Sequence, residues 1–128
     1  MSEKITFEII SPDRTILKIE TNEVIIPAFE GEIGILKDHV PLITFLRPGL
    51  IKTKENSENS FFVENGTVEF SNNNLLILTS TAIELSKLDK NIIEKMIKEA
   101  EAKVENGDFS DKDRYLQSHK ISTLKSIN

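Results

Sequence analysis

Residues 24–46 read VIIPAFEGEIGILKDHVPLITFL, an apolar stretch interrupted by Pro27, Gly31, Gly34 and Pro41. Glycine reaches backbone angles closed to other residues, and proline fixes its own φ and lacks an N–H donor. Inside apolar segments, such residues indicate strands that bend or pass close to another backbone. Charged and polar side chains lie between Gly31 and Pro41, so the stretch predicts a rigid surface shaped for contact.

Further short apolar runs, separated by turn residues, lie on both sides of this stretch. The dipeptide Asn65-Gly66 predicts a tight hairpin between strands 60–64 and 67–71. Asn72-Asn73-Asn74 predicts a second tight turn, and the polar residues 55–59 predict a hairpin tip. Strands are expected at residues 5–10, 15–20, 23–28, 32–36, 41–46, 50–54, 60–64, 67–71, 75–80 and 82–85. The residues expected to shape the turns are Pro27, Gly31, Gly34, Pro41, Gly49 and Gly66.

Roughly ten short strands with a turn at each junction are typical of an antiparallel β-sandwich or flattened barrel. We therefore expect residues 1–85 to form a β-sandwich with one core between two sheets. After residue 85 the apolar period changes to that of a helix, with Asp89 as a candidate cap.

The last 43 residues, 86–128, predict an antiparallel helical hairpin. Asn106-Gly107 would end the first helix in a left-handed conformation. Ser110, with Asp113 three residues later, predicts the start of a second helix from residue 111 to about residue 126. This second helix has weak intrinsic propensity, so it needs a surface to lie on, either its own sandwich or another protein.

The amino-acid composition excludes several classes of function. The chain has 128 residues, 38% hydrophobic and 29% charged, which is ordinary for one globular domain with an appendage. A net charge of −5 gives no general affinity for nucleic acid or anionic lipid. The absence of cysteine excludes disulfides and thiolate chemistry. We expect no secretory signal, transit peptide or membrane span, and a cytoplasmic location.

Catalytic and metal motifs are missing from the sequence. His39 and His119 lie in different subregions, and neither has a metal-ligand spacing around it. Glu30 and Glu32 would point to the same face of a strand. A solvated strand edge explains this pair more simply than acid–base chemistry does. The residues alone therefore indicate a protein that is not an enzyme and holds no cofactor or metal.

A longer pattern is more specific. It runs Ile26-Pro27-x-x-Glu30-Gly31-Glu32-Ile33-Gly34-Ile35-Leu36-x-x-His39-Val40-Pro41-Leu42 and continues through Leu46-x-Pro48-Gly49 and Leu75-Leu76-Ile77-Leu78. This pattern closely resembles the epsilon subunit of the bacterial F-type ATP synthase. The resemblance covers residues 4–85, and the helical hairpin after Leu88-Asp89 matches in position and pattern.

The resemblance implies a non-catalytic subunit of the central rotor stalk in a proton-translocating enzyme. The sandwich would bind the gamma subunit and stand on the c-ring, at the cytoplasmic face of the bacterial inner membrane. The loop from Glu30 to Asp38 would be the foot on the ring. The residues it assigns to the c-ring contact are Glu30, Glu32, Asp38 and His39.

The resemblance also implies a regulatory hairpin. In the family it lies folded on the sandwich or extends along gamma to the catalytic alpha and beta subunits and blocks ATP hydrolysis. The cations of the second helix that would serve this role are Arg114, Lys120 and Lys125. The family's ATP motif is matched here only at Leu88 and Asp89, because Ile92 and Ile93 replace its Arg-Ala, so no bound ATP is expected.

Two other functions compete with the rotor subunit. The first is a stand-alone ligand-binding sandwich with a helical appendage, which would bind a small molecule and have no affinity for a gamma subunit. The second is an enzyme whose pocket gathers Glu30, Glu32 and His39, which nothing in the spacing requires.

Overall fold

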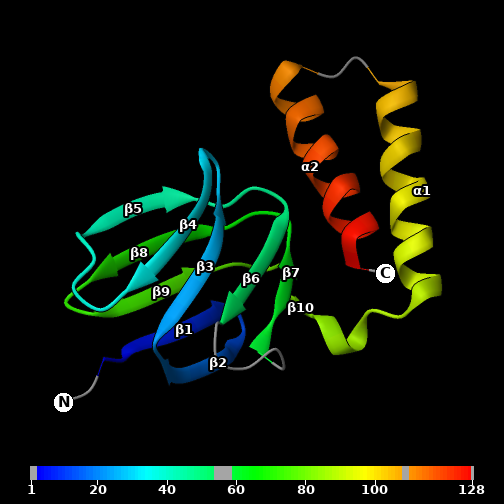
Figure 1. Ribbon diagram of the computed structural model, residues 1–128. Coiled ribbons are helices and arrows are strands. Elements are labelled where there is room, and N and C mark those ends of the chain that lie inside the picture. Colours follow the sequence, from blue (N-terminus) through cyan, green and yellow to red (C-terminus); the bar gives the residue numbers. More distant parts are fainter. Residues whose placement is uncertain (1–2, 54–58, 108–109, 128) are drawn as a thin grey trace.

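Two five-stranded sheets pack face to face, and a pair of helices stands beside them (Figure 1). The structure is a computed structural model that describes residues 3–53, 59–107 and 110–127. The sheet orders are β2-β1-β9-β8-β5 and β10-β7-β6-β3-β4. The strands are β1 (Ile5–Ser11), β2 (Arg14–Thr21), β3 (Glu23–Ala28), β4 (Gly31–Leu36), β5 (Leu42–Phe45), β6 (Gly49–Thr53), β7 (Phe61–Val63), β8 (Thr67–Ser71), β9 (Asn74–Leu78) and β10 (Ile83–Glu84). The predicted sandwich followed by a helical hairpin is confirmed.

Alternate side chains of the strands fill the space between the sheets. In β1 the side chains of Ile5, Phe7 and Ile9 are buried, whereas those between them are partly exposed. This follows from the two-residue period of a strand, which sends successive side chains to opposite faces. The rest of this core consists of Val24, Ile26, Ile35, Leu46, Ile51, Phe61, Val63, Val68, Phe70, Leu75 and Ile77.

One pair of strands departs from the antiparallel arrangement. β1 runs parallel to β9, with Phe7 opposite Leu75 and Ile9 opposite Ile77. One edge of β1 is occupied by β2 and one edge of β9 by β8, so the two strands meet along their remaining edges. The pairing places segments about 70 residues apart in sequence side by side in the centre of a sheet.

The predicted hairpin at Asn65-Gly66 is wrong. β7 pairs with β6 and β10, whereas β8 pairs with β5 and β9, so the chain crosses between the sheets at this dipeptide. Gly66 has a φ of +151°, and a Cβ atom there would lie 2.6 Å from the carbonyl oxygen of Leu78. The glycine is needed for this close approach of two backbones rather than for a two-residue turn.

The turn expected at residues 72–74 is confirmed as the hairpin between β8 and β9. Ser71 pairs with Asn74, and the two residues between them, Asn72 and Asn73, have φ values of +51° and +60°. Positive φ at both central positions matches the right-handed twist of the flanking strands, and asparagine tolerates that conformation better than most residues.

The other turn candidates lie at different kinds of position. Pro27 is inside β3, paired with Glu32, and Gly34 is inside β4, so neither shapes a turn. Gly31 opens β4 with a φ of +145°, and Gly49 opens β6. A Cβ atom at Gly49 would lie 2.5 Å from the Cβ of Pro27, so this glycine permits close packing between strands. Pro41 directly precedes β5.

Two antiparallel helices follow a short 3₁₀ helix, η2 (Leu85–Lys87): α1 (Lys90–Asn106) and α2 (Asp111–Ile127). Asp89 caps α1 as predicted, since its carboxylate accepts a hydrogen bond from the Ile92 amide at 2.8 Å. The Ser110 hydroxyl accepts from the Asp113 amide at 3.2 Å. The first helix ends at Asn106 as expected, but Gly107 is extended (φ −112°, ψ 144°) rather than left-handed.

The strand and helix bounds otherwise agree with expectation to within two residues, apart from the predicted tip at residues 55–59 and the end of the strand at residue 54. Residues 54–58 lie outside the described residues. Neither α1 nor α2 has the length and apolar character that a bilayer crossing requires, and the same is true of every helix in the described ranges.

Candidate partner-binding surfaces

The β4–β5 loop forms one end of the sandwich and carries Asp38 and His39. The amide of Asp38 donates to Asn73 Oδ1 at 2.7 Å, and Asn73 Nδ2 donates back to Asp38 Oδ1 at 3.3 Å. The His39 ring meets the ring of Phe70 edge-on at 5.9 Å, and its Nδ1 donates to the Val40 carbonyl at 2.7 Å. These contacts fasten the loop to the β8–β9 turn, so this end presents polar groups in a fixed arrangement.

Glu30 and Glu32 do not belong to the same loop as Asp38. The expected loop from Glu30 to Asp38 is mostly the strand β4, and a strand of this length spans roughly 20 Å. Glu30 lies in the β3–β4 turn rather than on a strand, and its carboxylate accepts from Thr44 Oγ1 at 3.1 Å. The Glu32 carboxylate lies 4.0 Å from Lys52 Nζ. The structure therefore brings Asp38 and His39 together and places the two glutamates toward the other end of β4.

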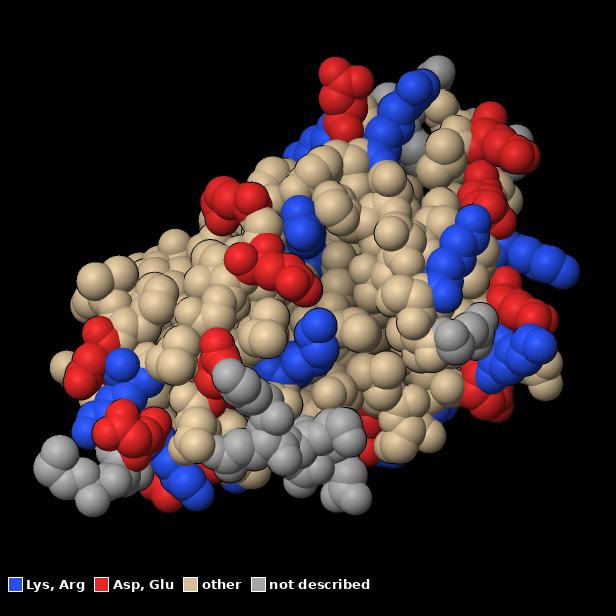
Figure 2. All heavy atoms as spheres, in the orientation of Figure 1, with Lys and Arg blue, Asp and Glu red and all other residues tan. Residues whose placement is uncertain are grey.

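A strip of exposed apolar side chains runs along β5 and the loop before it. Ile43 is 81% exposed and Phe45 63%, and both point outward from β5, which is an edge strand. Val40, in the preceding loop, is 69% exposed, and Leu36, at the end of β4, is 49% exposed. Figure 2 shows tan side chains over β5, with charged ones gathered below it. We call Leu36, Val40, Ile43 and Phe45 the β5 strip.

The β5 strip continues toward the helices. Phe45 lies opposite Thr67, which lies opposite the 46%-exposed Leu78 on the next strand. Phe45 and Thr67 also border a groove of about 540 Å³ between the sandwich and α2, whose lining includes Phe29, Pro48 and Leu116. Exposed apolar side chains that gather along one edge strand are a candidate interaction surface, whereas scattered single apolar residues are ordinary on a protein surface.

The helical hairpin docks on the outer face of the second sheet through an apolar cluster. Phe62 of β7 is fully buried there, together with Leu88, Ile93 of α1 and Leu124 of α2. β7 is therefore buried on both faces, with all three of its residues inaccessible. This explains why its sequence, FFV, does not alternate.

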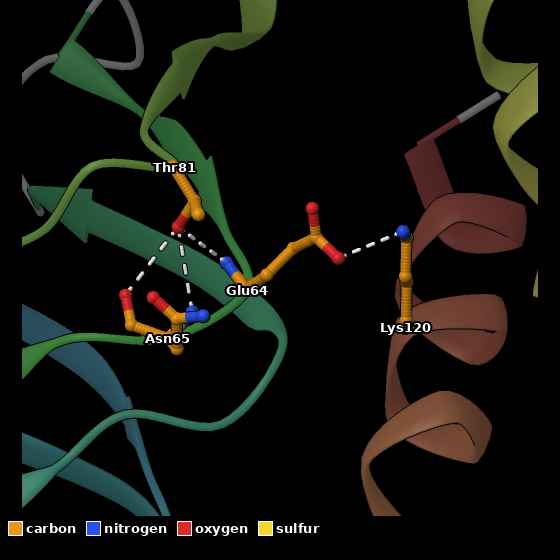
Figure 3. A network of polar contacts seen from close by, with 4 residues as sticks. All are labelled: Glu64, Asn65, Thr81 and Lys120. Atoms are coloured by element: carbon orange, nitrogen blue, oxygen red, sulfur yellow. Dashed lines mark hydrogen bonds and ion pairs between the residues drawn. The ribbon is translucent and has the colours of Figure 1, made fainter. Parts of the chain in front are cut away.

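Two groups of polar contacts join α2 to the sandwich. In the first, Lys120 Nζ lies 2.7 Å from Glu64 Oε1 (Figure 3). The backbone at Glu64 is itself fixed, because Thr81 Oγ1 accepts from the Glu64 amide at 3.0 Å and Thr79 Oγ1 donates to the Asn65 carbonyl at 2.7 Å. The ion pair therefore connects α2 to the crossing point between the two sheets.

The second group centres on Tyr115. Its hydroxyl donates to the Phe29 carbonyl at 2.6 Å and accepts from Arg47 Nη1 at 2.9 Å. Its ring packs against Phe29 at 5.1 Å and meets the His119 ring at 4.5 Å in a T-shaped contact. Burial and the neighbouring Arg47 guanidinium lower the pKa of His119 from its ordinary value of 6.5.

The three cations assigned to the regulatory helix are in different environments. Arg114 and Lys125 are exposed, and Lys125 Nζ lies 3.9 Å from a carboxylate oxygen of Glu101 on α1. Lys120 is only 9% exposed, so in this arrangement it holds α2 against the sandwich and is not presented to another protein. The contact between Arg47 and Tyr115 is not predicted from the sequence, because no local pattern links residues 68 positions apart.

Both matched residues of the ATP motif have structural roles here. Leu88 packs in the apolar cluster under the hairpin, and the Asp89 carboxylate caps α1. Among the residues that the structure describes, no group of three or more histidine, aspartate or glutamate side chains is arranged to hold a metal ion.

Comparison with known proteins gives one consistent family. The model for the β-sandwich domain of the ATP synthase delta/epsilon chain matches residues 4–85. The ATP synthase epsilon chain of Pelagibacter ubique (strain HTCC1062) is 45% identical over 130 residues, covering 100% of both chains. That of Sinorhizobium fredii (strain NBRC 101917 / NGR234) is 32% identical over 106 residues, covering 81% of this chain and 79% of the relative.

Solved structures share the fold. A chain in the cryo-EM structure of the Euglena gracilis mitochondrial ATP synthase (OSCP/F1/c-ring) superposes with a TM-score of 0.77 at 20% identity. The match covers 98% of this chain and 82% of that chain. A chain of the central stalk and c-ring of the Tetrahymena thermophila enzyme superposes with a TM-score of 0.63 at 14% identity, covering 98% and 95%.

Proposed function

Because the chain belongs to the ATP synthase delta/epsilon family, we propose that it is a non-catalytic rotor subunit of the central stalk of a proton-translocating F-type ATP synthase. The observation that carries this proposal is the β5 strip, which leaves Ile43 and Phe45 largely exposed. A stalk subunit that transmits rotation needs a partner surface on a rigid body rather than a catalytic pocket. The sandwich meets this requirement at one end, since two hydrogen bonds between Asp38 and Asn73 fasten the β4–β5 loop to the β8–β9 turn.

The gamma subunit is the proposed partner of the β5 strip. Apolar area at the centre of an interface contributes most of its affinity, and a polar rim adds specificity. Here the apolar side chains of β5 are flanked by polar residues of the neighbouring strand, among them Thr67 and Glu69. This gives the composition expected of a permanent contact with another protein.

The end of the sandwich that carries Asp38 and His39 is the proposed contact with the c-ring. Exposed ion pairs at such a contact would each contribute only about 0.2–1 kcal/mol, so the fixed shape of the loop must share the work. Glu30 and Glu32 are retained as a second candidate contact, because they lie toward the other end of β4. Paired variants, Asp38→Asn with His39→Gln and Glu30→Gln with Glu32→Gln, distinguish the two ends by their effect on coupling of proton flow to ATP synthesis.

The hairpin is the proposed regulatory element. Docked on the sandwich, it buries Lys120 and Leu124, so these side chains are not available to another subunit. Once released and extended, α2 would present Arg114, Lys120 and Lys125 to acidic segments of the catalytic head and slow ATP hydrolysis. The complex would lie at the cytoplasmic face of the bacterial inner membrane, which this subunit reaches only through its partners.

The test is co-purification of the chain with its gamma subunit, followed by the ATPase rate of the assembled enzyme with and without the chain. Stoichiometric binding with slower hydrolysis supports both the rotor role and the inhibitory hairpin. Binding with an unchanged rate supports the rotor role and contradicts inhibition. Absence of binding contradicts the rotor role and favours a stand-alone ligand-binding sandwich.

A further inference from the structure

His119 lies at the seam between α2 and the sandwich, in contact with a permanent cation. Its Nε2 is 3.3 Å from Nη1 of Arg47, which lies between β5 and β6. Its ring meets Tyr115, one helical turn earlier, edge-on at 4.5 Å. Arg47 also donates to the Tyr115 hydroxyl, so one guanidinium joins the sandwich to both side chains.

The hydrogen bond from Arg47 requires neutral histidine. A guanidinium has only donors, so Nε2 of His119 must accept, and the ring proton must reside on Nδ1. Protonation places a hydrogen on Nε2, which removes the acceptor and sets two positive charges against each other. The contact is therefore available in one protonation state of the imidazole and is lost in the other.

Other charged groups near His119 do not offset the loss of the Arg47 contact on protonation. A hollow of about 140 Å³ beside His119 is also lined by Glu32 of β4 and Lys52 of β6, and this hollow is open to solvent. Glu32 would favour a charged imidazole, but its carboxylate is shared with Lys52 at 4.0 Å. Among the residues that the structure describes, Arg47 makes a hydrogen bond to the His119 ring, and the hollow gives protons access to this ring.

We propose that His119 and Arg47 form a proton-sensitive latch, in which protonation of His119 weakens the docking of the helical hairpin on the sandwich. Undocked, the imidazole is solvated and binds a proton more readily than in the docked state. The lowered pKa of docked His119 agrees with this, because a group that binds protons less readily when docked favours docking at high pH. The latch contributes its full free energy to docking above the ordinary pKa of 6.5, and this contribution falls as the pH drops through and below that value.

The effect of the latch on ATP hydrolysis rests on the proposed regulatory function, but the existence of the latch does not. If the hairpin inhibits ATP hydrolysis when extended, acidification of the cytoplasm would favour the inhibitory form. The latch itself is a property of the isolated chain, so a failure of the latch and a failure of the regulatory role give different results.

The experiment measures the docked fraction of the full chain at about pH 8 and about pH 5.5, which brackets the titration of histidine. The chain has no cysteine, so spin labels can be placed at Glu69→Cys on β8 and Lys98→Cys on α1, both exposed positions. The distance distribution between the labels then reports docked and undocked populations. Proton linkage at one pH unit below the ordinary pKa of 6.5 can change this equilibrium by at most about tenfold, so we expect a change of roughly two- to tenfold.

We expect the docked-to-undocked ratio to fall by this factor at the lower pH in the parent chain. In His119→Gln, which keeps an acceptor but cannot be protonated, the ratio should not respond to pH. His39→Gln is the matched control, since it removes the other histidine, 80 positions away, and should respond like the parent.

Three results would overturn the latch: a ratio independent of pH in the parent, a response that persists in His119→Gln, or a response that disappears in His39→Gln. If His119→Gln is already undocked at the higher pH, Arg47→Gln decides instead. It keeps a donor for Nε2 and removes the facing charge, so its response to acid must be smaller than that of the parent, and an equal response contradicts the proposal.

Discussion

Replacement of Tyr115 by phenylalanine isolates the polar contacts that hold the hairpin on the sandwich. The substitution removes one hydroxyl and leaves the ring, which packs against Phe29 and His119. Two hydrogen bonds are lost, one to the Phe29 carbonyl at 2.6 Å and one from Arg47 at 2.9 Å. The expected result is therefore weaker docking without a change in apolar packing.

The size of the effect follows from the two bonds. A neutral hydrogen bond contributes about 0.5–1.5 kcal/mol and one to a charged group about 1.5–3 kcal/mol. Tyr115 is half-buried, so water replaces part of what is lost. We expect a cost of about 1–3 kcal/mol, which raises the population of the undocked hairpin by a factor of roughly 5 to 150.

Hydrogen exchange of backbone amides measures this population. The second helix has weak propensity and would fray when undocked, so its amides should exchange faster by the same factor in Tyr115→Phe. Amides of β1 and β9, in the centre of a sheet, should exchange as in the parent. Ser118→Ala, which removes a hydroxyl from an exposed position of α2, is the matched control. Unchanged exchange in α2, or equal acceleration in β1 and β9, would refute the reasoning.

Four further substitutions test other parts of the structure. Leu124→Ala, at a fully buried position under the hairpin, should cost about 2–5 kcal/mol of docking free energy, measured by the same exchange in α2, and unchanged protection there would contradict the packing. Gly66→Ala should lower the free energy of unfolding by at least about 1–3 kcal/mol in urea, because its Cβ would meet a carbonyl oxygen at 2.6 Å. Gly31→Ala has a similar φ but open space, so it should cost less, and equal losses would show that the close contact does not matter. The Ser11 hydroxyl, which donates to Asp13 at 2.8 Å, lowers the pKa of that carboxyl below its ordinary 3.8, so the stabilisation is fully present above 3.8 and is lost as the pH falls further, through the lowered pKa of the folded state. Ser11→Ala should raise the pKa of Asp13 in an NMR titration, and an unchanged value would exclude this hydrogen bond as the cause.

Local patterns in the sequence predict the strands and helices of this protein well. The alternation of buried and exposed side chains in β1 and the helix cap at Asp89 depend on residues close in sequence, so both are predictable from the sequence. Local patterns do not determine which strands pair with one another. The Asn65-Gly66 dipeptide has the chemistry of a hairpin, but its glycine serves a close contact with Leu78, 12 residues away.

For the candidate surfaces too, local features are predicted from the sequence and long-range contacts are not. The stretch around Gly31 and Pro41 is correctly predicted to contain strands, but Glu30 and Asp38 lie at opposite ends of a strand that the resemblance treats as a loop. The exposure of Ile43 and Phe45 could not be predicted, because an apolar side chain on an edge strand is buried or exposed according to what covers it. Contacts such as Arg47 with Tyr115 form only when the helices fold back.

The measurement that tests the account most directly is the affinity of the chain for its gamma subunit, compared with that of Ile43→Ser, by titration calorimetry. Ile43 is 81% exposed in the β5 strip, so the substitution should leave folding almost unchanged and weaken binding about tenfold or more. Ile92→Ser makes the same change at an isoleucine of α1 that is 41% exposed, and it should bind like the parent. Equal affinities of the parent and Ile43→Ser would contradict the assignment of the β5 strip as the gamma-binding surface, and absence of binding in the parent would contradict the rotor role itself.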